Sequence, residues 1–384
     1  MREDSKKYLY LGALTFALIC VGLVMVYSAS HPIATQEYGN SSFFLLRHFI
    51  RLIIGVVMMA VGMAVPYQKW AKFGRLFILV SFVLLLLVLV PSPYRLTINK
   101  AHRWLRFGGL QFQPVDFVRV FVIFYLADVL TRKEAVLDRF KEGLLPQLIV
   151  LGFILGMILL QPDLGSTLLL ASIITILLIT GGIPLKFLAP FTGIIPVGFL
   201  LMHDYQRLRI IKFLDSVIHG EPVSYQVSQS LVGLGKGGFW GVGLDNSTQK
   251  LHFLPEPFSD FIVSILGEEF GFLGIFIVLT AVLIVIIMGY RIAQRASDKE
   301  GMLMAVGITS TIALYAFVNA GVVTSLLPTN GLPMPFISYG GSFQISNLWG
   351  IGILVNIMKQ SMDYKETTAE RDWEFRPRAA WVQK

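Results

Sequence analysis

The sequence predicts an all-α, polytopic membrane protein of about ten transmembrane helices, with a large extracytoplasmic loop between helices 7 and 8. Composition is the first observation: 55 % of the 384 residues are hydrophobic and only 15 % are charged, which is too apolar for a soluble globular protein. The second is length, because apolar stretches near the roughly 20 residues that cross a bilayer recur along the whole chain. The third is that most lysines and arginines fall in alternate connections between these stretches.

The apolar stretches define the expected spans in order. We place them at roughly 9–29, 49–66, 74–90, 113–130, 145–160, 165–182, 187–203, 261–288, 302–326 and 336–357. The fifth and sixth are short and share a polar break, so they could instead form a re-entrant pair. The first follows basic residues and could be a signal peptide, but its apolar core exceeds the usual 7–15 residues.

The distribution of positive charge predicts the orientation. With residues 1–8 inside, most of the 32 lysines and arginines lie in inner segments, as the positive-inside rule requires. Both termini, including a tail at 360–384, are therefore expected in the cytoplasm, and 9–359 forms the transmembrane domain. The net charge of +8 needs no nucleic-acid partner to explain it. Cys20 is the single cysteine, so no disulfide within the chain holds the outer loops together.

Two outer loops, 91–112 and 204–260, contain basic and aromatic residues, in "NKAHRWLRFGGLQFQP" and "MHDYQRLRIIKFL". Such stretches could lie at the level of the lipid headgroups as amphipathic segments. Their cations would also suit an anionic headgroup such as a pyrophosphate.

Acidic residues recur where outer loops meet spans. "QPVD" (113–116) and "QPDLGS" (161–166) both place Gln-Pro beside a carboxylate, and proline suits a first helical turn. Each acid could simply complement a helix dipole. Asp116 and Arg119 share a helix face and could pair. If Asp116, Arg119, Asp163 and Asp260 converge, they form one polar cavity that opens outward.

Glu268 and Glu269 lie about 12–13 Å beyond Asp260 along a straight helix. We interpret them as structural partners for polar groups on other helices, with a proton or ion path as the alternative. The glycine-rich stretch 233–250 lacks the pattern of a phosphate-binding loop. The Pro/Gly-broken stretch 326–342 should line the same cavity, because non-helical backbone at this depth needs protein or water around it. The sequence shows no metal-ligand spacing and no catalytic triad.

Five motifs in order carry a family resemblance: "QPDLGS", "MHDYQRLR", "YQVSQSLVGLGKGGFWGVGL", "FLPEPFSDFIVSILGEE" and "LLPTNGLPMPFISYGGS". Together they resemble the SEDS family, which includes FtsW and RodA, over about residues 10 to 360. The stretches "GVGLDNSTQKLHFLPE" and "VGLVMVYSAS" are closer to the cell-division branch, FtsW. "MHDYQRLR" is closer to RodA, the cell-elongation branch, so the subtype stays open.

The resemblance implies a peptidoglycan glycosyltransferase that polymerises lipid II outside the cytoplasmic (inner) membrane. Its implied partners are a class B penicillin-binding protein and other division or elongation membrane proteins. The family's essential aspartate corresponds to Asp260, and its polar cavity residues to Asp116, Arg119 and Asp163. "QPVDFVR" departs from the usual QPSE followed by lysine, so the substrate role of Asp116 and Arg119 is less secure. Further substrate-binding candidates from the loops and motifs are Arg103, Gln229, Ser230, Glu256 and Ser338.

These expectations give a mechanism and its rivals. A sugar hydroxyl attacks an anomeric carbon while a lipid pyrophosphate leaves, and Asp260, kept ionised by a helix N-terminus, takes the hydroxyl proton. A divalent cation, Mg²⁺ or Mn²⁺, is expected to assist, with ligands that the sequence does not identify. The main alternative is a lipid II transporter or flippase, which Glu268 and Glu269 favour. A non-catalytic scaffold would leave the cavity acids without a purpose.

Overall fold

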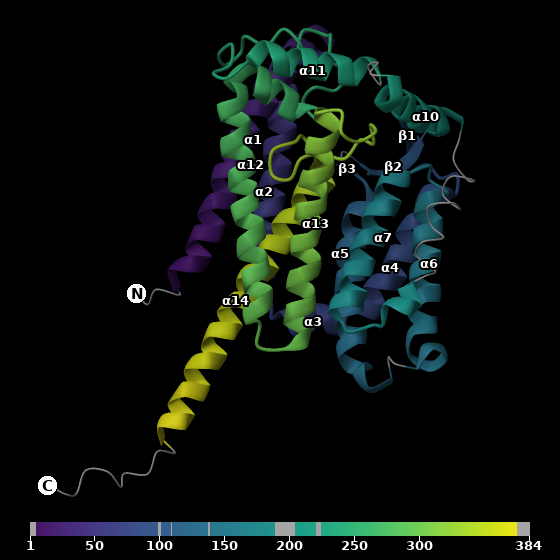
Figure 1. Cartoon of the computed structure of the whole chain (residues 1–384), viewed down its shortest axis with the longest axis vertical. Helices are drawn as coiled ribbons and strands as arrows, with labels where there is room; N and C mark the ends of the chain where they lie inside the picture. Colours follow the sequence, from purple (N-terminus) through teal and green to yellow (C-terminus); the bar gives the residue numbers. More distant parts are fainter. Residues whose placement is uncertain are drawn as a thin grey trace, which may run out of the picture.

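The computed structural model describes residues 5–98, 101–108, 110–136, 139–188, 204–219 and 224–374. Figure 1 shows long helices side by side, with α10 (Asp204–His219), α11 (Tyr225–Gly237) and a small sheet gathered at one end. The start of α1 (Ser5–Tyr38) and the end of α14 (Gly341–Glu374) point away from that end. Both ends of the described chain therefore lie on the side opposite the long segment predicted outside.

Helices occupy the predicted spans wherever the structure describes them. They are α1, α2 (Phe43–Ala64), α4 (Gly74–Leu89), α5 (Pro114–Arg132), α6 (Leu145–Leu159), α7 (Leu164–Thr180), α12 (Ile262–Arg295), α13 (Lys299–Val323) and α14. Short helical elements connect some of them: α3 (Tyr67–Lys72), η1 (Glu134–Val136), η2 (Phe140–Leu144) and η3 (Leu185–Leu188). The predicted span 187–203 lies outside the described residues apart from its first two positions. α14 runs beyond its predicted end and into the expected tail at 360–384, of which 375–384 are not described.

The helices fit a polytopic membrane protein. In the described ranges, 5 helical segments are long and apolar enough to cross a bilayer: Leu9–Tyr38, Phe43–Ala64, Phe140–Leu159, Ile262–Arg295 and Lys299–Val323. α4 and α7 are equally apolar but shorter. α5 carries charge in its first turn and is enclosed by other helices, with nearly every side chain buried. A helix that other helices enclose on all sides in this way belongs to the interior of the bundle.

The first apolar stretch is an integral part of the bundle. α1 contacts α2, α12 and α14, and Leu11, Leu18 and Met25 belong to the main hydrophobic core. α2 and α14 approach most closely through glycines, since a side chain at Gly62 or Gly352 would overlap the backbone of the facing helix. Small residues are the usual means of close helix contact in a membrane.

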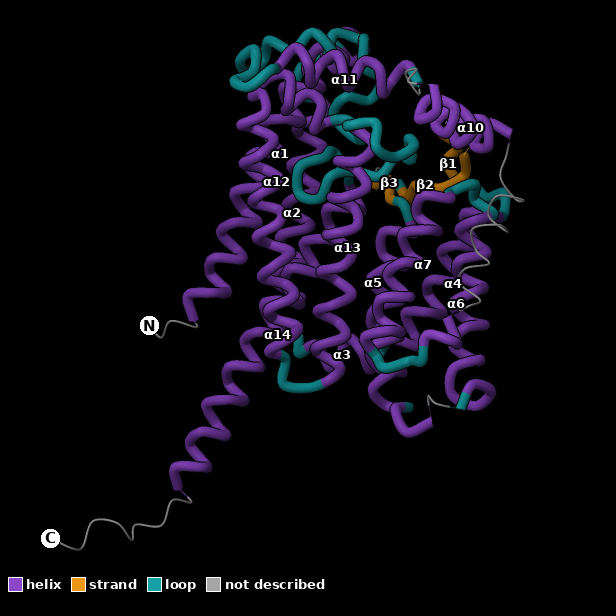
Figure 2. The backbone as a smooth tube through the Cα atoms, viewed as in Figure 1, coloured by secondary structure: helices purple, strands orange, loops and turns teal. Residues whose placement is uncertain are grey.

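The fold is helical and polytopic as predicted, and the outer loop at 91–112 adds one three-stranded antiparallel sheet that was not predicted. Its strands are β1 (Arg95–Ile98), β2 (Ala101–Phe107) and β3 (Leu110–Phe112), in the order β1-β2-β3. Figure 2 shows this sheet beside α10, where the loops gather. Leu105 is fully buried while Arg106 beside it is exposed, which is the alternation of a half-buried strand. This loop is therefore a half-buried sheet, whereas 204–219 is helical.

The fifth and sixth spans are two crossing helices rather than a re-entrant pair. η2 lengthens α6 to Phe140–Leu159, which is long enough to cross a membrane. The turn between α6 and α7 meets the sheet, since Arg103 on β2 donates from Nε to the Gln161 carbonyl at 3.3 Å. The polar break therefore lies at the outer end of the bundle and not halfway through it.

Candidate active site

A polar cavity of about 650 Å³ opens between the sheet, α10 and the outer ends of the bundle helices. It collects side chains from segments far apart in the sequence. Those that carry its polar chemistry are Arg103, Gln113, Asp116, Asp163, Ser166, Arg209, Gln226, Glu256, Ser259, Asp260, Tyr315, Asn330, Tyr339 and Ser342. The structure therefore brings together Asp116, Asp163 and Asp260, as their positions at the outer ends of spans suggested. Arg103 and Glu256 line the same cavity.

Asp260 lies in the loop before α12 and is partly exposed to the cavity. Ser259 Oγ donates to Asp260 Oδ1 at 3.0 Å. α12 begins at Ile262 with Phe261 in the N-cap position and no side-chain cap. The Asp260 carboxylate is therefore not the N-cap of this helix and is available to the cavity.

The surroundings of Asp260 raise its pKa to about 6, so the carboxyl group is still mostly ionised at neutral pH although it does not cap α12. Burial is the main cause, and the negative charge of Glu256 adds to it. The Ser259 hydrogen bond and the charges of Arg209 and Arg103 act in the opposite direction. A carboxyl group with such a pKa is suited to accept a proton near neutral pH.

The loop between α13 and α14 is joined to the Asp260 segment by buried hydrogen bonds. Asn319 Nδ2, on α13, donates both to the Asp260 carbonyl at 2.7 Å and to the Leu332 carbonyl at 2.8 Å. Ser338 Oγ donates to the Ser259 carbonyl at 2.7 Å. Gly331 has a φ of +69° and lies against the Asp260 carboxylate, where an added Cβ would be 3.2 Å from Oδ2. This loop therefore lines the cavity, as its Pro/Gly pattern predicted, and fixes the position of Asp260.

Asp163 combines a structural and a cavity position. It caps α7, accepting from the Ser166 backbone N–H at 3.2 Å and from Ser166 Oγ at 2.9 Å. Gln113 Nε2 donates to Asp163 Oδ2 at 3.2 Å, and Arg103 Nη1 lies 3.7 Å from Oδ1. Arg103 also donates to the Pro162 carbonyl. The outer ends of α5 and α7 and the sheet are thus joined around one carboxylate.

Arg119 lies beneath the cavity and does not line it, which corrects the predicted position. Its Nη1 is 3.7 Å from Asp116 Oδ1, and its side chain is only 2 % exposed. The guanidinium is held between the rings of Tyr315 and Phe343, at 4.5 and 4.7 Å from their centroids. Three residues further along α5 place it one turn deeper than Asp116. Asp116 itself accepts from Ser342 Oγ at 2.6 Å at the cavity wall.

The remaining candidates divide between the cavity and the helix contacts behind it. Ser230 is fully buried and contacts Ser264 Oγ at 2.6 Å. Gln229 does not line the cavity, whereas Gln226, one turn earlier on α11, does. Ser338 is also fully buried. It bonds the carbonyl of Ser259, the residue before Asp260, and not the Asp260 side chain. Glu256 lines the cavity with a positive φ of 50°, a strained value for a residue with a side chain.

Sequence reasoning missed Arg209 and Asn319. Arg209 is the last residue of the quoted "MHDYQRLR" stretch, so the motif contained the signal, but the cavity position depends on how α10 lies over the bundle. Asn319 is a polar residue inside an apolar span and is 1 % exposed. Such residues in membrane spans usually have a polar partner, and this was the available signal.

Glu268 and Glu269 form a buried network with the outer segment. Glu268 accepts from the Thr248 backbone N–H at 3.0 Å, from Thr248 Oγ1 at 2.9 Å and from Ser247 Oγ. Glu269 accepts from Ser28 Oγ at 2.6 Å and from Lys250 Nζ at 3.0 Å. Both acids therefore have polar partners as predicted, but among these hydrogen-bond donors only Ser28 comes from another helix, and the others come from residues 247–250.

α12 is not the single straight helix that was expected from the sequence. Gly271 has a φ of +65° and a ψ of −165°, which interrupts the helix two residues after Glu269. The Phe272 backbone N–H donates to the Gly238 carbonyl at 2.9 Å, so the outer loop packs into the break. Residues 262–270 therefore belong with the outer segment.

The acids of the cavity do not form a metal site by themselves. Across the described residues, no three His, Cys, Asp or Glu side chains are close enough to hold one ion. The expected Mg²⁺ or Mn²⁺ therefore does not fit a site built from these side chains alone.

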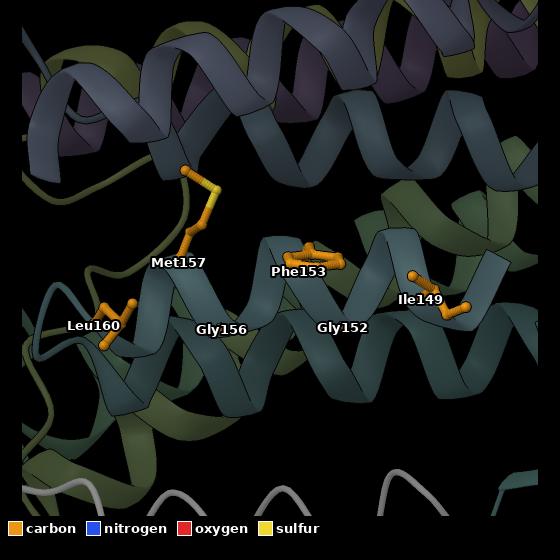
Figure 3. Close-up of a pocket in the computed structure, with 6 residues that line it drawn as sticks. All are labelled: Ile149, Gly152, Phe153, Gly156, Met157 and Leu160. Atoms are coloured by element: carbon orange, nitrogen blue, oxygen red, sulfur yellow. The ribbon is translucent and has the colours of Figure 1, made fainter. Parts of the chain in front are cut away.

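A second hollow is a groove of about 360 Å³ along α6, lined by Ile149, Gly152, Phe153, Gly156, Met157 and Leu160 (Figure 3). None of these side chains carries a group for acid–base or anion chemistry. The candidate active site is therefore the polar cavity at the outer end of the bundle.

Comparisons with known proteins agree with this architecture. The family model FTSW_RODA_SPOVE, described as cell cycle protein, matches residues 9–363. A probable peptidoglycan glycosyltransferase FtsW of Geobacter metallireducens is 37 % identical over 360 residues, covering 93 % of this chain and 96 % of that protein. Stage V sporulation protein E of Bacillus subtilis is 36 % identical over 358 residues, covering 92 % of this chain and 97 % of its own length.

Solved structures share the fold at lower identity. A chain of a peptidoglycan synthase complex superposes with a TM-score of 0.71 at 22 % identity, covering 91 % of this chain and 97 % of that chain. The rod shape determining protein RodA of Thermus thermophilus superposes with a TM-score of 0.66 at 23 % identity, covering 91 % and 96 %. At these identities the likeness concerns the fold alone.

Proposed function

The chain belongs to the FtsW, RodA and SpoVE family of cell cycle proteins, and from this we propose that it is a peptidoglycan glycosyltransferase that polymerises lipid II. Relatives of similar length are named as such enzymes. The observation that carries the proposal is the Asp260 carboxylate, which is partly exposed in a polar cavity with Arg103 and Arg209 in the same lining.

The proposed reaction is one direct displacement. A sugar hydroxyl of one lipid II attacks the anomeric carbon of another, the new C–O bond forms, and the bond to undecaprenyl pyrophosphate breaks. Asp260 takes the hydroxyl proton, a step typically worth 10²–10⁴-fold in rate. Arg103 and Arg209 stabilise the negative charge on the departing pyrophosphate. An α-linked donor then gives a β-linked glycan by inversion, with a single acid required.

The remaining cavity residues have supporting roles in this proposal. Asp163, Asp116 and Glu256 line the space for the two sugars. Arg119, Ser338 and Ser230 act from behind the cavity, as parts of the framework that holds it. A divalent cation is proposed only as a counter-ion of the pyrophosphate, and no step depends on it.

The cavity is proposed to face outward from the cytoplasmic membrane, with both termini in the cytoplasm. The lysine and arginine distribution supports this orientation, as does the position of α10, α11 and the sheet opposite the chain ends (Figure 1). We propose a class B penicillin-binding protein as the partner that cross-links the product, together with other division or elongation membrane proteins. The chain of the peptidoglycan synthase complex that shares this fold comes from an assembly described as coordinating polymerization and crosslinking.

The transporter alternative depended on deep acids along a translocation path. Glu268 and Glu269 instead accept hydrogen bonds from Thr248, Ser28 and Lys250. This supports a structural role and favours polymerisation over transport. The purified chain and its cross-linking partner, given lipid II and Mg²⁺, should make glycan strands that a muramidase cuts to disaccharide units. A preparation that folds but makes no such polymer would contradict the proposal.

The rate of polymerisation should fall as the pH drops below about 6. Asp260, with its pKa near 6, must be ionised to accept the proton, so protonation at lower pH removes the base. At pH 5 about one tenth of the molecules would carry ionised Asp260, which predicts a rate about tenfold below the plateau. Glu256→Gln removes a neighbouring negative charge and should move this acid limb to lower pH. An acid limb that is unchanged in this variant would argue against Asp260 as the titrating group.

Asn319→Leu should lower kcat about tenfold or more while changing KM little. The substitution removes both donors that tie Asp260 and Leu332 to α13, and a shift of about 1 Å at the base can cost 10²-fold. Thr311→Val is the matched control, since Thr311 lies on the same helix and bonds only the Gly307 carbonyl, at 2.9 Å. Normal kcat in a folded Asn319→Leu protein would show that this amide does not position Asp260.

A further inference from the structure

Arg51 is a cation inside a membrane-spanning helix without an acidic partner among the described residues. It lies on α2 (Phe43–Ala64), eight positions after the helix begins, or about 12 Å along its axis. Its recorded contact is with an aromatic ring and not with a carboxylate. A charge in a span is costly, and such a residue usually serves a ligand or a polar path.

Arg51 packs against the wall of the polar cavity. Its guanidinium carbon is 5.2 Å from the centroid of the Tyr339 ring. A Cβ added to Gly341 would lie 3.1 Å from Arg51 Nε. Tyr339 and Gly341 both line the cavity, whereas Arg51 does not. The guanidinium therefore lies against the segment 339–341, which lines the Asp260 cavity.

A second polar group without a partner lies on the same part of α2. His48, three residues before Arg51, is fully buried, and neither of its ring nitrogens has a hydrogen-bond partner. Its ring centroid is 5.5 Å from that of Tyr339. An imidazole N–H and a guanidinium on one helix face are donors that an anion can satisfy.

The outer end of α2 gives access from the lipid. Arg47, one turn before Arg51, is exposed, with its guanidinium 4.0 Å from the centroid of the Phe43 ring. Phe44 contacts Phe258, with ring centroids 4.6 Å apart, in the segment that leads to Asp260. An anionic headgroup in the outer leaflet could therefore reach Arg51 along the exposed side of α2 while its sugars extend toward Asp260.

We propose that Arg51, supported by His48, binds the pyrophosphate of a second lipid-linked substrate, the one whose pyrophosphate is not displaced. The inference rests on the proposed function, because a polymerase that joins two lipid-linked chains holds two pyrophosphates near one base. Arg103 and Arg209, which line the cavity, serve the pyrophosphate that leaves. Arg51 serves the retained one, behind Tyr339 and Gly341.

The two anion sites should differ in their kinetic effect. The retained pyrophosphate carries the same charge in the ground state and in the transition state, so a contact with it contributes uniform binding. Loss of uniform binding raises KM and leaves kcat unchanged. Arg51→Gln is therefore expected to raise KM for lipid II about tenfold or more, the effect of losing one charged hydrogen-bond donor. Arg51→Lys should recover part of this loss.

Binding to an inactive protein tests the site without turnover. Full-length Asp260→Asn protein with its partner should bind two molecules of lipid II, and the Asp260→Asn, Arg51→Gln protein only one at the same concentration. Arg106→Gln is the control, since Arg106 is an exposed outer arginine that donates to the Gly108 carbonyl at 3.3 Å. It should leave both KM and the stoichiometry unchanged.

Phosphatidylglycerol distinguishes the substrate from an ordinary lipid headgroup. If it displaces one lipid II at equal concentration, Arg51 is a general phospholipid site and the proposal is wrong. Two bound lipid II molecules in the Arg51→Gln variant, or a fall in kcat with unchanged KM, would also overturn it. These binding results do not require polymer formation, so they are separable from a failure of the proposed function.

Discussion

Asp260→Asn should fold normally and polymerise lipid II at least about 10²-fold more slowly than the unmodified protein. Asparagine is nearly the same size, and its carbonyl oxygen can still accept from Ser259 Oγ, which lies 3.0 Å from Asp260 Oδ1. The backbone bond from Asn319 to residue 260 does not involve the side chain. The substitution therefore removes the base and leaves the loop in place.

The control for this result is another aspartate replaced in the same way. Asp298 caps α13, accepting from the Gly301 backbone N–H at 2.7 Å, and asparagine ranks with aspartate as an N-cap. Asp298→Asn should keep its activity. Asp260→Glu retains the charge but moves it by about 1 Å, which can itself cost 10²-fold. Rates are compared per folded molecule, with binding of the cross-linking partner measured alongside.

Lys250→Met should destabilise the fold by about 3–5 kcal/mol, the usual cost of leaving one member of a buried ion pair alone. Lys250 is 2 % exposed, with its Nζ 3.0 Å from Glu269 Oε1 and 3.1 Å from Ser28 Oγ. It also bonds Asp245, which in turn lies 2.7 Å from His31 Nε2. Removing the ammonium strands the Glu269 carboxylate between α1 and α12. The apparent melting temperature in detergent should fall by several degrees.

Two further variants separate charge from packing in this network. Lys250→Met combined with Glu269→Gln removes both charges, so it should be more stable than Lys250→Met alone. Lys236→Met removes a cation that is 45 % exposed and 3.9 Å from Glu268, and exposed pairs contribute only about 0–1 kcal/mol. Equal melting temperatures for Lys250→Met and Lys236→Met would contradict a structural role for the buried pair.

The spans could be predicted because the length and hydropathy of a stretch can be judged from that stretch alone. The sequence also predicted that Asp116, Asp163 and Asp260 meet, because all three lie where outer loops join spans. The depth of Arg119 could not be predicted this way, since pairing with Asp116 is compatible with either a cavity or a buried position. The rings of Tyr315 and Phe343, far away in sequence, decide it.

Other errors came from assuming regular helices. The span 261–288 was predicted as one straight helix, but Gly271 interrupts α12 and the outer loop packs against the break. Ser230 was taken into the site from its motif, whereas its hydroxyl contacts Ser264 between α11 and α12. The sheet at 95–112 was missed because three short strands carry little periodic signal.

The most direct test of the central claim compares polymerisation and translocation in the same vesicles. The unmodified protein and Asp260→Asn, each with the cross-linking partner, are reconstituted into liposomes that contain labelled lipid II in both leaflets. The proposed mechanism predicts glycan polymer with the unmodified protein, at least about 10²-fold less with Asp260→Asn, and the same rate of lipid II movement between leaflets in both. Polymer formation that survives the substitution, or lipid movement that depends on Asp260, would contradict it.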